Sequence, residues 1–65
     1  MNMDELKGRF TEMKGHIREQ WGDLSDDEVA ETRGEREQLI GKIQAKYGKT
    51  REEAEREFDE WLAKL

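Results

Sequence analysis

The sequence predicts a small all-α fold, a four-helix bundle made of two crossed α-hairpins, and three observations indicate it. Apolar residues recur at steps of three and four along most of the chain, which is the spacing of one helix face. No proline is present, so no helix is interrupted by a residue that lacks a backbone N–H. Glycine and hydroxyl residues fall between the apolar runs, where helix ends and helix starts favour them.

Length and composition indicate one folded domain over residues 1–65. A chain of 65 residues buries too little surface to form two cores. Charged residues make up 45% and hydrophobic residues 32%, a balance that leans toward disorder, but the five aromatic residues fall at helical spacings. We therefore expect a folded domain with a very polar surface.

The first helix is predicted from about Asp4 to Trp21. The apolar residues that share its buried face are Met3, Leu6, Phe10, Met13, Ile17 and Trp21. Gly22 follows at once and suits the left-handed position that ends many helices. We therefore expect one continuous helix over the first third of the chain.

A short second helix is predicted from Asp26 to near Arg33. Ser25 is the expected N-cap, and Glu28 three residues later completes a capping box. Its acidic first turn suits the positive end of the helix dipole.

The third helix is predicted from about Gly34 to Tyr47, and the fourth from the cap at Thr50 to the end of the sequence. Gly48 ends the third helix, and Glu53 completes a second capping box with Thr50. The apolar faces of these two helices comprise Leu39, Ile40, Ile43, Tyr47, Ala54, Phe58, Trp61, Leu62 and Leu65.

A weak internal repeat relates the two halves of the chain. Residues 15–22 match residues 41–48, and each copy predicts a helix, an aromatic residue, a glycine stop, a hydroxyl cap and a second helix. This pattern is why two α-hairpins packed around one core are expected. The predicted central core consists of Phe10, Ile17, Trp21, Ile43, Tyr47, Phe58 and Trp61.

Two stretches of the chain resemble the two blocks of the CsbD-like family. They are MKGHIREQWGDLSDD over residues 13–27 and GEREQLIGKIQAKYG over residues 34–48. His16 and Ser25 depart from the family pattern, which usually has Lys and Thr there. The resemblance implies a small helical bundle, abundant in bacteria under general, osmotic or nutrient stress, with no established enzymatic activity and no binding residues to carry over.

No residue set typical of a catalytic, cofactor or metal site is present. The absence of cysteine excludes disulfides, thiolate zinc sites and thiol nucleophiles. His16, the one histidine, has Glu12 and Glu19 a turn away on either side, which falls short of usual ligand sets, and an ion pair with Glu12 is expected instead. Ser25, the one serine, is explained by its cap. We expect no enzyme, no cofactor and no metal.

Acidic residues concentrate in residues 23–32, where they are Asp23, Asp26, Asp27, Glu28 and Glu31. They lack the glycine and the spacing of a calcium loop. A solvated helix start accounts for them, and a surface that binds a partner's basic patch is the alternative.

Seven basic residues are the candidates for a nucleic-acid surface: Lys7, Lys14, Arg18, Arg33, Arg36, Lys42 and Lys46. Acidic residues lie among them, and we expect no exposed aromatic residue beside a basic cluster. Our leading hypothesis is therefore a monomeric, non-catalytic, cytoplasmic stress-response protein without a membrane segment, acting through a protein partner or as a solvated protectant. A nucleic-acid-associated module is the alternative.

Three glycines occupy predicted helix interiors and project away from the apolar faces: Gly8, Gly15 and Gly41. Each costs about 0.5 to 1 kcal/mol relative to alanine. Close approach of another helix, within the fold or from a partner, would account for them. Deliberately weak helices that order on binding, or substitutions tolerated in a marginal domain, are the other two explanations.

Overall fold

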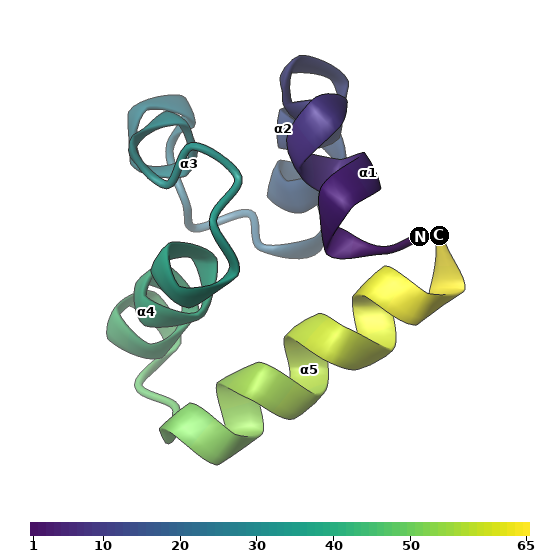
Figure 1. The fold of residues 1–65 in the computed structure, drawn as a ribbon. Coiled ribbons are helices and arrows are strands. Elements are labelled where there is room, and N and C mark those ends of the chain that lie inside the picture. The colour runs from purple at the N-terminus through teal and green to yellow at the C-terminus, as the bar shows by residue number, and fades with distance from the viewer.

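Five α-helices and no strand make up the chain in a computed structural model that describes residues 1–65 (Figure 1). The helices are α1 (Met3–Gly8), α2 (Phe10–Gln20), α3 (Asp26–Glu31), α4 (Arg36–Tyr47) and α5 (Arg51–Lys64). The predicted all-α fold class is confirmed. In Figure 1, α5 runs diagonally along one side of the molecule, the other four helices lie to its other side, and the two ends of the chain meet.

The predicted first helix is in fact two helices, so the expected four-helix bundle of two crossed hairpins is corrected to five helices. The break falls at Arg9, whose backbone has φ −113° and ψ 29°, outside the helical region. Gly8 directly precedes it, and glycine is a weak helix former. A capping box of Asn2 and Glu5, which the sequence analysis missed, starts α1 at Met3.

The helix ends are only partly as expected. Gly48 ends α4 in the left-handed conformation, with φ 62° and ψ 33°, as predicted. Gly22 is not at positive φ, so the predicted left-handed stop after α2 is wrong. The chain turns instead through a 3.1 Å hydrogen bond from Leu24 N to Trp21 O, and Trp21 is the C-cap of α2.

The connection between α3 and α4 is a tight turn over residues 32–34, which the sequence analysis assigned to the ends of the two helices. Arg33 and Gly34 both have positive φ, 54° and 76°, so neither continues a right-handed helix. The buried hydroxyl of Thr32 closes the turn, since it donates to Val29 O at 2.6 Å and accepts from Gly34 N at 3.3 Å. Gly34 is therefore a turn residue, and α4 begins at Arg36.

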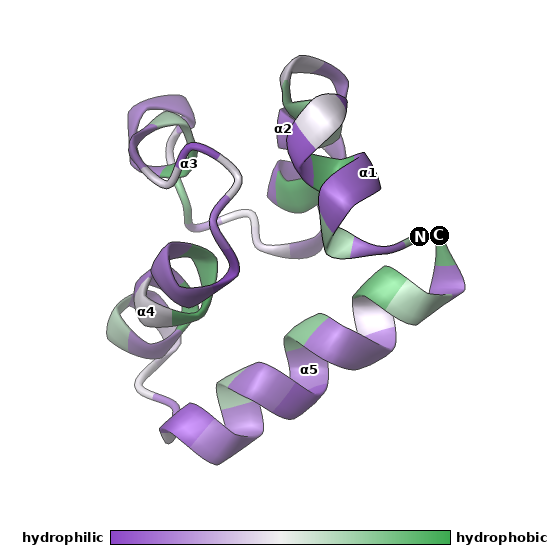
Figure 2. Cartoon of the chain, viewed as in Figure 1, coloured by the Kyte–Doolittle hydropathy of each residue, from purple (hydrophilic) through white to green (hydrophobic).

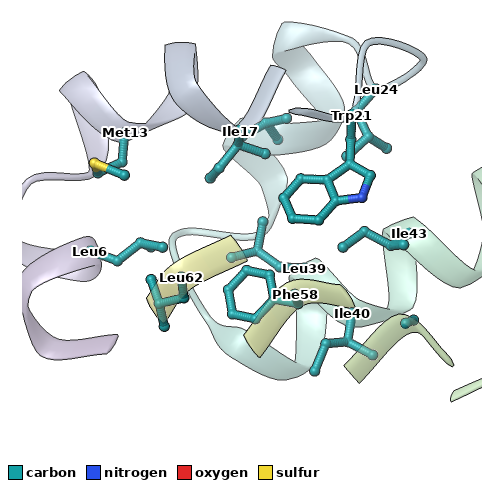
Figure 3. Packing of buried hydrophobic residues seen from close by; sticks show 12 residues of the cluster. Leu6, Met13, Ile17, Trp21, Leu24, Leu39, Ile40, Ile43, Phe58 and Leu62 are labelled. Atoms are coloured by element: carbon teal, nitrogen blue, oxygen red, sulfur yellow. The ribbon is translucent and has the colours of Figure 1, made fainter. Parts of the chain in front are cut away.

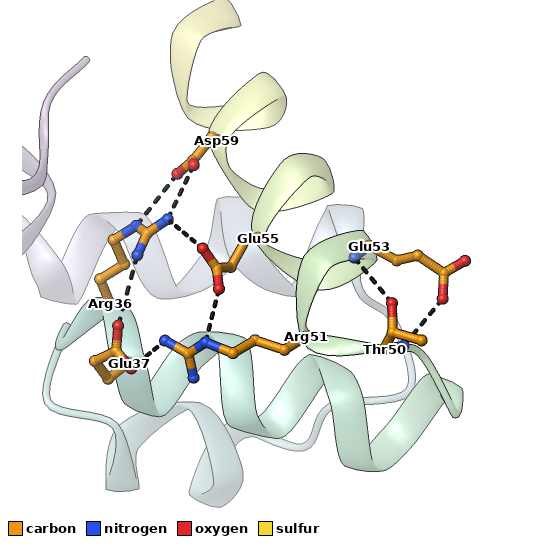
Figure 4. A network of polar contacts seen from close by, with 7 residues as sticks. All are labelled: Arg36, Glu37, Thr50, Arg51, Glu53, Glu55 and Asp59. Atoms are coloured by element: carbon orange, nitrogen blue, oxygen red, sulfur yellow. Dashed lines mark hydrogen bonds and ion pairs between the residues drawn. The ribbon is translucent and has the colours of Figure 1, made fainter.

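Both predicted capping boxes are confirmed. The Ser25 hydroxyl accepts from Glu28 N at 3.1 Å, and the Glu28 carboxylate accepts from Ser25 N at 3.0 Å. Thr50 and Glu53 make the same two contacts at 3.1 and 3.0 Å (Figure 4). These reciprocal bonds satisfy N–H groups that a helix start leaves without an intrahelical partner, which fixes where α3 and α5 begin.

A single apolar core holds the helices together (Figure 3). Its buried members are Leu6, Met13, Ile17, Trp21, Leu24, Val29, Leu39, Ile40, Ile43, Ala54, Phe58 and Leu62. They come from all five helices and from the connection after α2, so no helix packs separately. The hydrophilic positions lie mainly on the outward faces (Figure 2).

Four of the seven residues predicted for the central core are buried, namely Ile17, Trp21, Ile43 and Phe58. Phe10, Tyr47 and Trp61 are only partly buried at its edge, and their central placement was wrong. Phe10 is the first residue of α2, directly after the break, and the Tyr47 hydroxyl reaches out to a loop. Trp61 packs edge-on against Trp21, with ring centroids 5.0 Å apart.

Candidate functional site

The acidic segment over residues 23–32 is held between basic side chains of α2 and α4. Its ion pairs join Asp26 to Arg18 at 3.0 Å, Glu28 to Lys46 at 3.1 Å and Glu31 to Lys42 at 3.5 Å. The backbone N–H of Ser25, and secondarily Lys46, lower the pKa of Glu28. Asp23 and Asp27 are exposed and form no ion pair. Most of this segment therefore already has a partner within the fold.

Arg36 connects the start of α4 to α5 (Figure 4). Its Nη2 and Nε lie 2.9 and 3.2 Å from the two carboxylate oxygens of Asp59, and its Nη2 lies 3.6 Å from Glu55. Arg51 extends the network, since its Nε lies 2.7 Å from Glu55 and its Nη2 contacts Glu37. The bond to Asp59 raises the pKa of Arg36 further. This fork-to-fork contact joins the start of α4 to α5 at the surface.

Five of the seven basic residues considered for nucleic-acid binding are paired with carboxylates: Lys7, Arg18, Arg36, Lys42 and Lys46. Each such pair must be broken or shared before the side chain can neutralise a phosphate. Lys14 and Arg33 form no ion pair. The structure therefore does not bring the seven together as one free basic surface.

The histidine environment differs from the expectation. Glu12 pairs with Arg9 at 2.8 Å rather than with His16, because residues three apart on a helix are also neighbours. The hydrogen bond from Arg9 lowers the pKa of Glu12. His16 is exposed and forms no ion pair. No three acidic or histidine side chains gather in a way that could hold a metal ion, and the surface has no pocket.

Two polar contacts tie the residues that follow α2 to the end of α4 and to α5. Trp21 Nε1 donates to Glu57 Oε1 at 2.6 Å, and Glu57 Oε2 also accepts from Lys49. Asp23 N donates to the Tyr47 hydroxyl oxygen at 3.0 Å. The bond from Lys49 lowers the pKa of Glu57, with a smaller contribution from Trp21. Trp21 and Tyr47, which occupy matching positions of the internal repeat, thus each form a hydrogen bond to the other half of the chain.

A basic and aromatic surface lies where α1 and α2 meet the α3–α4 turn, and we call it the Phe10 patch: Lys7, Phe10 and Lys14. Lys14 Nζ lies 5.9 Å from the centre of the Phe10 ring. A Cβ added to Gly34 would lie 3.3 Å from both Lys7 Cα and Phe10 Cδ1, so the turn packs directly on these residues.

The expectation that no exposed aromatic residue would lie beside a basic cluster is not contradicted, because Phe10 is half-buried and Leu65 is the exposed large hydrophobic residue. Phe10 is partly exposed, and Lys14 covers part of its ring. The spacing of four between Phe10 and Lys14 could have placed these two on one helix face from sequence. The packing of Gly34 against Phe10 depends on the left-handed turn at residues 33–34, which an arginine at position 33 does not predict.

Space around the three helix glycines is open. No atom lies within 4 Å of where a Cβ would stand at Gly8, Gly15 or Gly41. Close approach of another helix within the fold is therefore not the reason for these glycines. Contact with a partner, weak helices and tolerated substitution remain as explanations.

None of the five helices is both long and apolar enough to cross a membrane.

Comparison with known proteins places the chain in a family. The family model described as CsbD-like matches residues 4–56. The chain belongs to the CsbD-like family. The resemblance seen in residues 13–27 and 34–48 is therefore confirmed.

Bacterial proteins of the CsbD-like family resemble the chain over nearly its whole length. The UPF0337 protein YjbJ of Escherichia coli O6:H1 is 48% identical over 61 residues, which cover 94% of this chain and 88% of that protein. The UPF0337 protein pc0632 of Protochlamydia amoebophila is 41% identical over 64 residues, or 98% and 97% of the two chains. No solved structure matches the chain at a significant level.

Proposed function

We propose that this CsbD-like protein is a non-catalytic, cytoplasmic stress-response protein that acts as a monomer by binding another protein through its charged surface. The stress context comes from the resemblance of residues 13–27 and 34–48 to the CsbD-like stress proteins. The proposed mode of action, binding of another protein, is inferred from how the fold uses its ionisable side chains.

One observation carries the proposal: many of the hydroxyl and charged residues considered as candidates from the sequence have structural roles at the surface. Ser25 and Glu28 cap α3, and Arg36 clamps α4 to α5. Groups used in this way stay ionised and solvated, whereas catalytic acids and bases are typically tuned by burial. A charged surface of this kind is suited to recognition through charge complementarity.

Two other modes compete with protein binding. A solvated protectant would use the same 45% charged composition without a specific partner. A nucleic-acid-associated module is less well supported, because five of its seven candidate basic residues are already paired with carboxylates.

In-cell crosslinking tests the proposal. The tagged protein would be crosslinked in stressed bacteria and captured with and without nuclease treatment, and bound proteins would be identified. A reproducible, nuclease-resistant partner is the expected result. Bound proteins that are lost after nuclease treatment would favour the nucleic-acid-associated module. The absence of any enriched protein would leave the solvated protectant as the remaining explanation. Sedimentation of the purified protein checks the monomeric state.

A further inference from the structure

The turn between α3 and α4 divides the buried core into two equal parts. Six of its twelve residues precede the turn: Leu6, Met13, Ile17, Trp21, Leu24 and Val29. The six that follow it are Leu39, Ile40, Ile43, Ala54, Phe58 and Leu62. The helices α1 to α3 therefore form one half of the molecule and α4 with α5 the other. Each half needs a half of the other kind to bury its apolar face.

Polar contacts between the two halves lie mainly outside the turn. They join Trp21 to Glu57, Asp23 to Tyr47, Glu28 to Lys46, and Glu31 to Lys42. Each of these contacts is made because the two halves pack together, and none requires the halves to belong to one chain. A half supplied by a second copy of the chain offers the same partners.

The turn itself is short and needs only a local change to become helical. Arg33 and Gly34 have positive φ, 54° and 76°, and Glu35 is extended, with φ −80° and ψ 127°. Thr32 before them already has right-handed helical dihedrals, and α4 begins directly after them at Arg36. A change of dihedrals confined to residues 33–35 would therefore join α3 and α4 into one helix.

The sequence is suited to that joined helix. Across the turn, residues recur at steps of three and four on one helix face: Val29, Thr32, Arg36, Leu39 and Ile43. No proline interrupts the segment. The turn is closed by the two hydrogen bonds of the Thr32 hydroxyl and by the packing of Gly34 against Lys7. Folding within one chain therefore selects the turn, whereas the local apolar pattern favours the helix.

We propose that two copies of the chain exchange halves through this turn, so that α4 and α5 of one copy pack on α1 to α3 of the other. Residues 26–47 form one helix in each copy of the exchanged dimer. The partner is a second copy because it presents the complementary half of the core, and the polar contacts between the halves re-form between the copies. The two forms then differ mainly at the turn.

Protein concentration sets the ratio of the two forms, because exchange takes two chains and closure takes one. The closed monomer of the proposed function prevails in dilute solution. The exchange goes beyond that function, since the dimer presents the same charged surface twice and can engage two partners or two sites on one partner.

Refolding at two concentrations tests the exchange. The protein would be unfolded in urea and refolded at micromolar or millimolar concentration, and its mass measured by size-exclusion chromatography with light scattering. Monomer alone is expected at micromolar concentration, and a dimer fraction at millimolar concentration. The isolated dimer should revert slowly on dilution, because the core must open before the halves separate. Monomer alone after millimolar refolding would overturn the proposal, as would a dimer that separates at once on dilution.

Two variants of the turn should change the dimer fraction in opposite directions. Arg33→Gly favours the left-handed turn and disfavours the joined helix, and should lower the dimerisation constant about tenfold. Gly34→Ala disfavours φ 76° and favours the helix, and should raise the constant about tenfold. Each dimer contains two such segments, so each substitution counts twice.

Gly41→Ala is the matched control for Gly34→Ala, because it makes the same change inside α4, where the added methyl group meets nothing within 4 Å. Gly41 is helical in both forms, so the dimer fraction of this variant should equal that of the parent. Equal increases in the two alanine variants would contradict the role of the turn. If Gly34→Ala does not refold, Arg33→Gly decides, since a dimer fraction unchanged from the parent would also refute the exchange.

Discussion

The buried indole of Trp21 donates a 2.6 Å hydrogen bond to Glu57, a residue 36 positions later on α5. Trp21 is 1% exposed, so its N–H has little access to water when that acceptor is removed. The same carboxylate accepts from Lys49, so one side chain joins α2, α5 and the connection between α4 and α5.

Replacement of Glu57 should destabilise the fold through the indole. We expect Glu57→Ala to lower the free energy of unfolding by about 1 to 3 kcal/mol, the usual cost of leaving a buried donor without a partner. Glu57→Gln keeps a carbonyl acceptor for Trp21 and loses only the ion pair with Lys49, so it should cost less. Urea denaturation followed by tryptophan fluorescence measures both. Equal losses in the two variants would show that the indole hydrogen bond contributes nothing.

The two tryptophans should differ in their importance for stability. Trp21 is buried against Phe58, with ring centroids 6.0 Å apart, and Trp21→Ala should cost about 3 to 5 kcal/mol, enough to unfold a domain of this size. Trp61 is partly exposed at the edge of the core, so Trp61→Ala should cost less and retain a cooperative melt. Circular dichroism melts provide the comparison. A Trp61→Ala protein that is unfolded while Trp21→Ala still melts cooperatively would reverse the assignment.

Glycine-to-alanine changes should have opposite signs at Gly34 and Gly41. At Gly34, with φ 76° and Lys7 Cα 3.3 Å from the added methyl group, alanine should lower the free energy of unfolding by about 1 to 3 kcal/mol. At Gly41 the added methyl group meets nothing within 4 Å, and alanine should raise it by about 0.4 to 1 kcal/mol. Urea midpoints of the two variants decide the matter. Destabilisation by Gly41→Ala would mean that the glycine is required by something within the folded chain.

Most features set by neighbouring residues were predictable from the sequence, although the capping box of Asn2 and Glu5 was missed and Gly22 was wrongly predicted to be left-handed, and features set by contacts across the fold were not predictable. The capping boxes at Ser25 and Thr50 span three residues each, and both are present. The apolar spacing continues unchanged across the break at Arg9. Periodicity alone therefore predicts one continuous helix there. The left-handed turn at Arg33 depends on Gly34 packing against the start of α2.

The candidate surface shows the same division. The sequence identified the charged residues and the cap role of Ser25, but it could not show which basic residues would be paired. Arg36 and Asp59 are 23 residues apart, and their contact requires α4 and α5 to be packed together. That Lys14 and Arg33 lack an ion pair is known only once the ion pairs of the other basic residues are known. The Phe10 patch could therefore be defined only from the structure.

The capping carboxylates should make stability depend on pH in the acid range. The pKa values of Glu28 and Glu53 are lowered, in each case mainly by a hydrogen bond from the backbone N–H of the cap residue. The pKa of Glu57 is lowered mainly by Lys49. A carboxyl group with a lower pKa in the folded state contributes stability above its unfolded pKa of about 4.3, and this contribution is lost as the pH falls through the folded pKa. The free energy of unfolding should therefore stay level from neutral pH to about 5.5 and fall below about 4.3.

Glu53→Gln isolates one contribution to this acid dependence. A glutamine at the third helical position can still accept from the N-cap N–H, and it does not titrate. We therefore expect the stability of this variant to fall less steeply below about pH 4.3 than that of the parent. Glu52→Gln is the control, because Glu52 is exposed and makes neither a cap hydrogen bond nor an ion pair. Urea titrations over a series of acid pH values measure the slopes. The same slope in Glu53→Gln and in the parent would mean that the cap carboxylate is not the group whose protonation weakens α5.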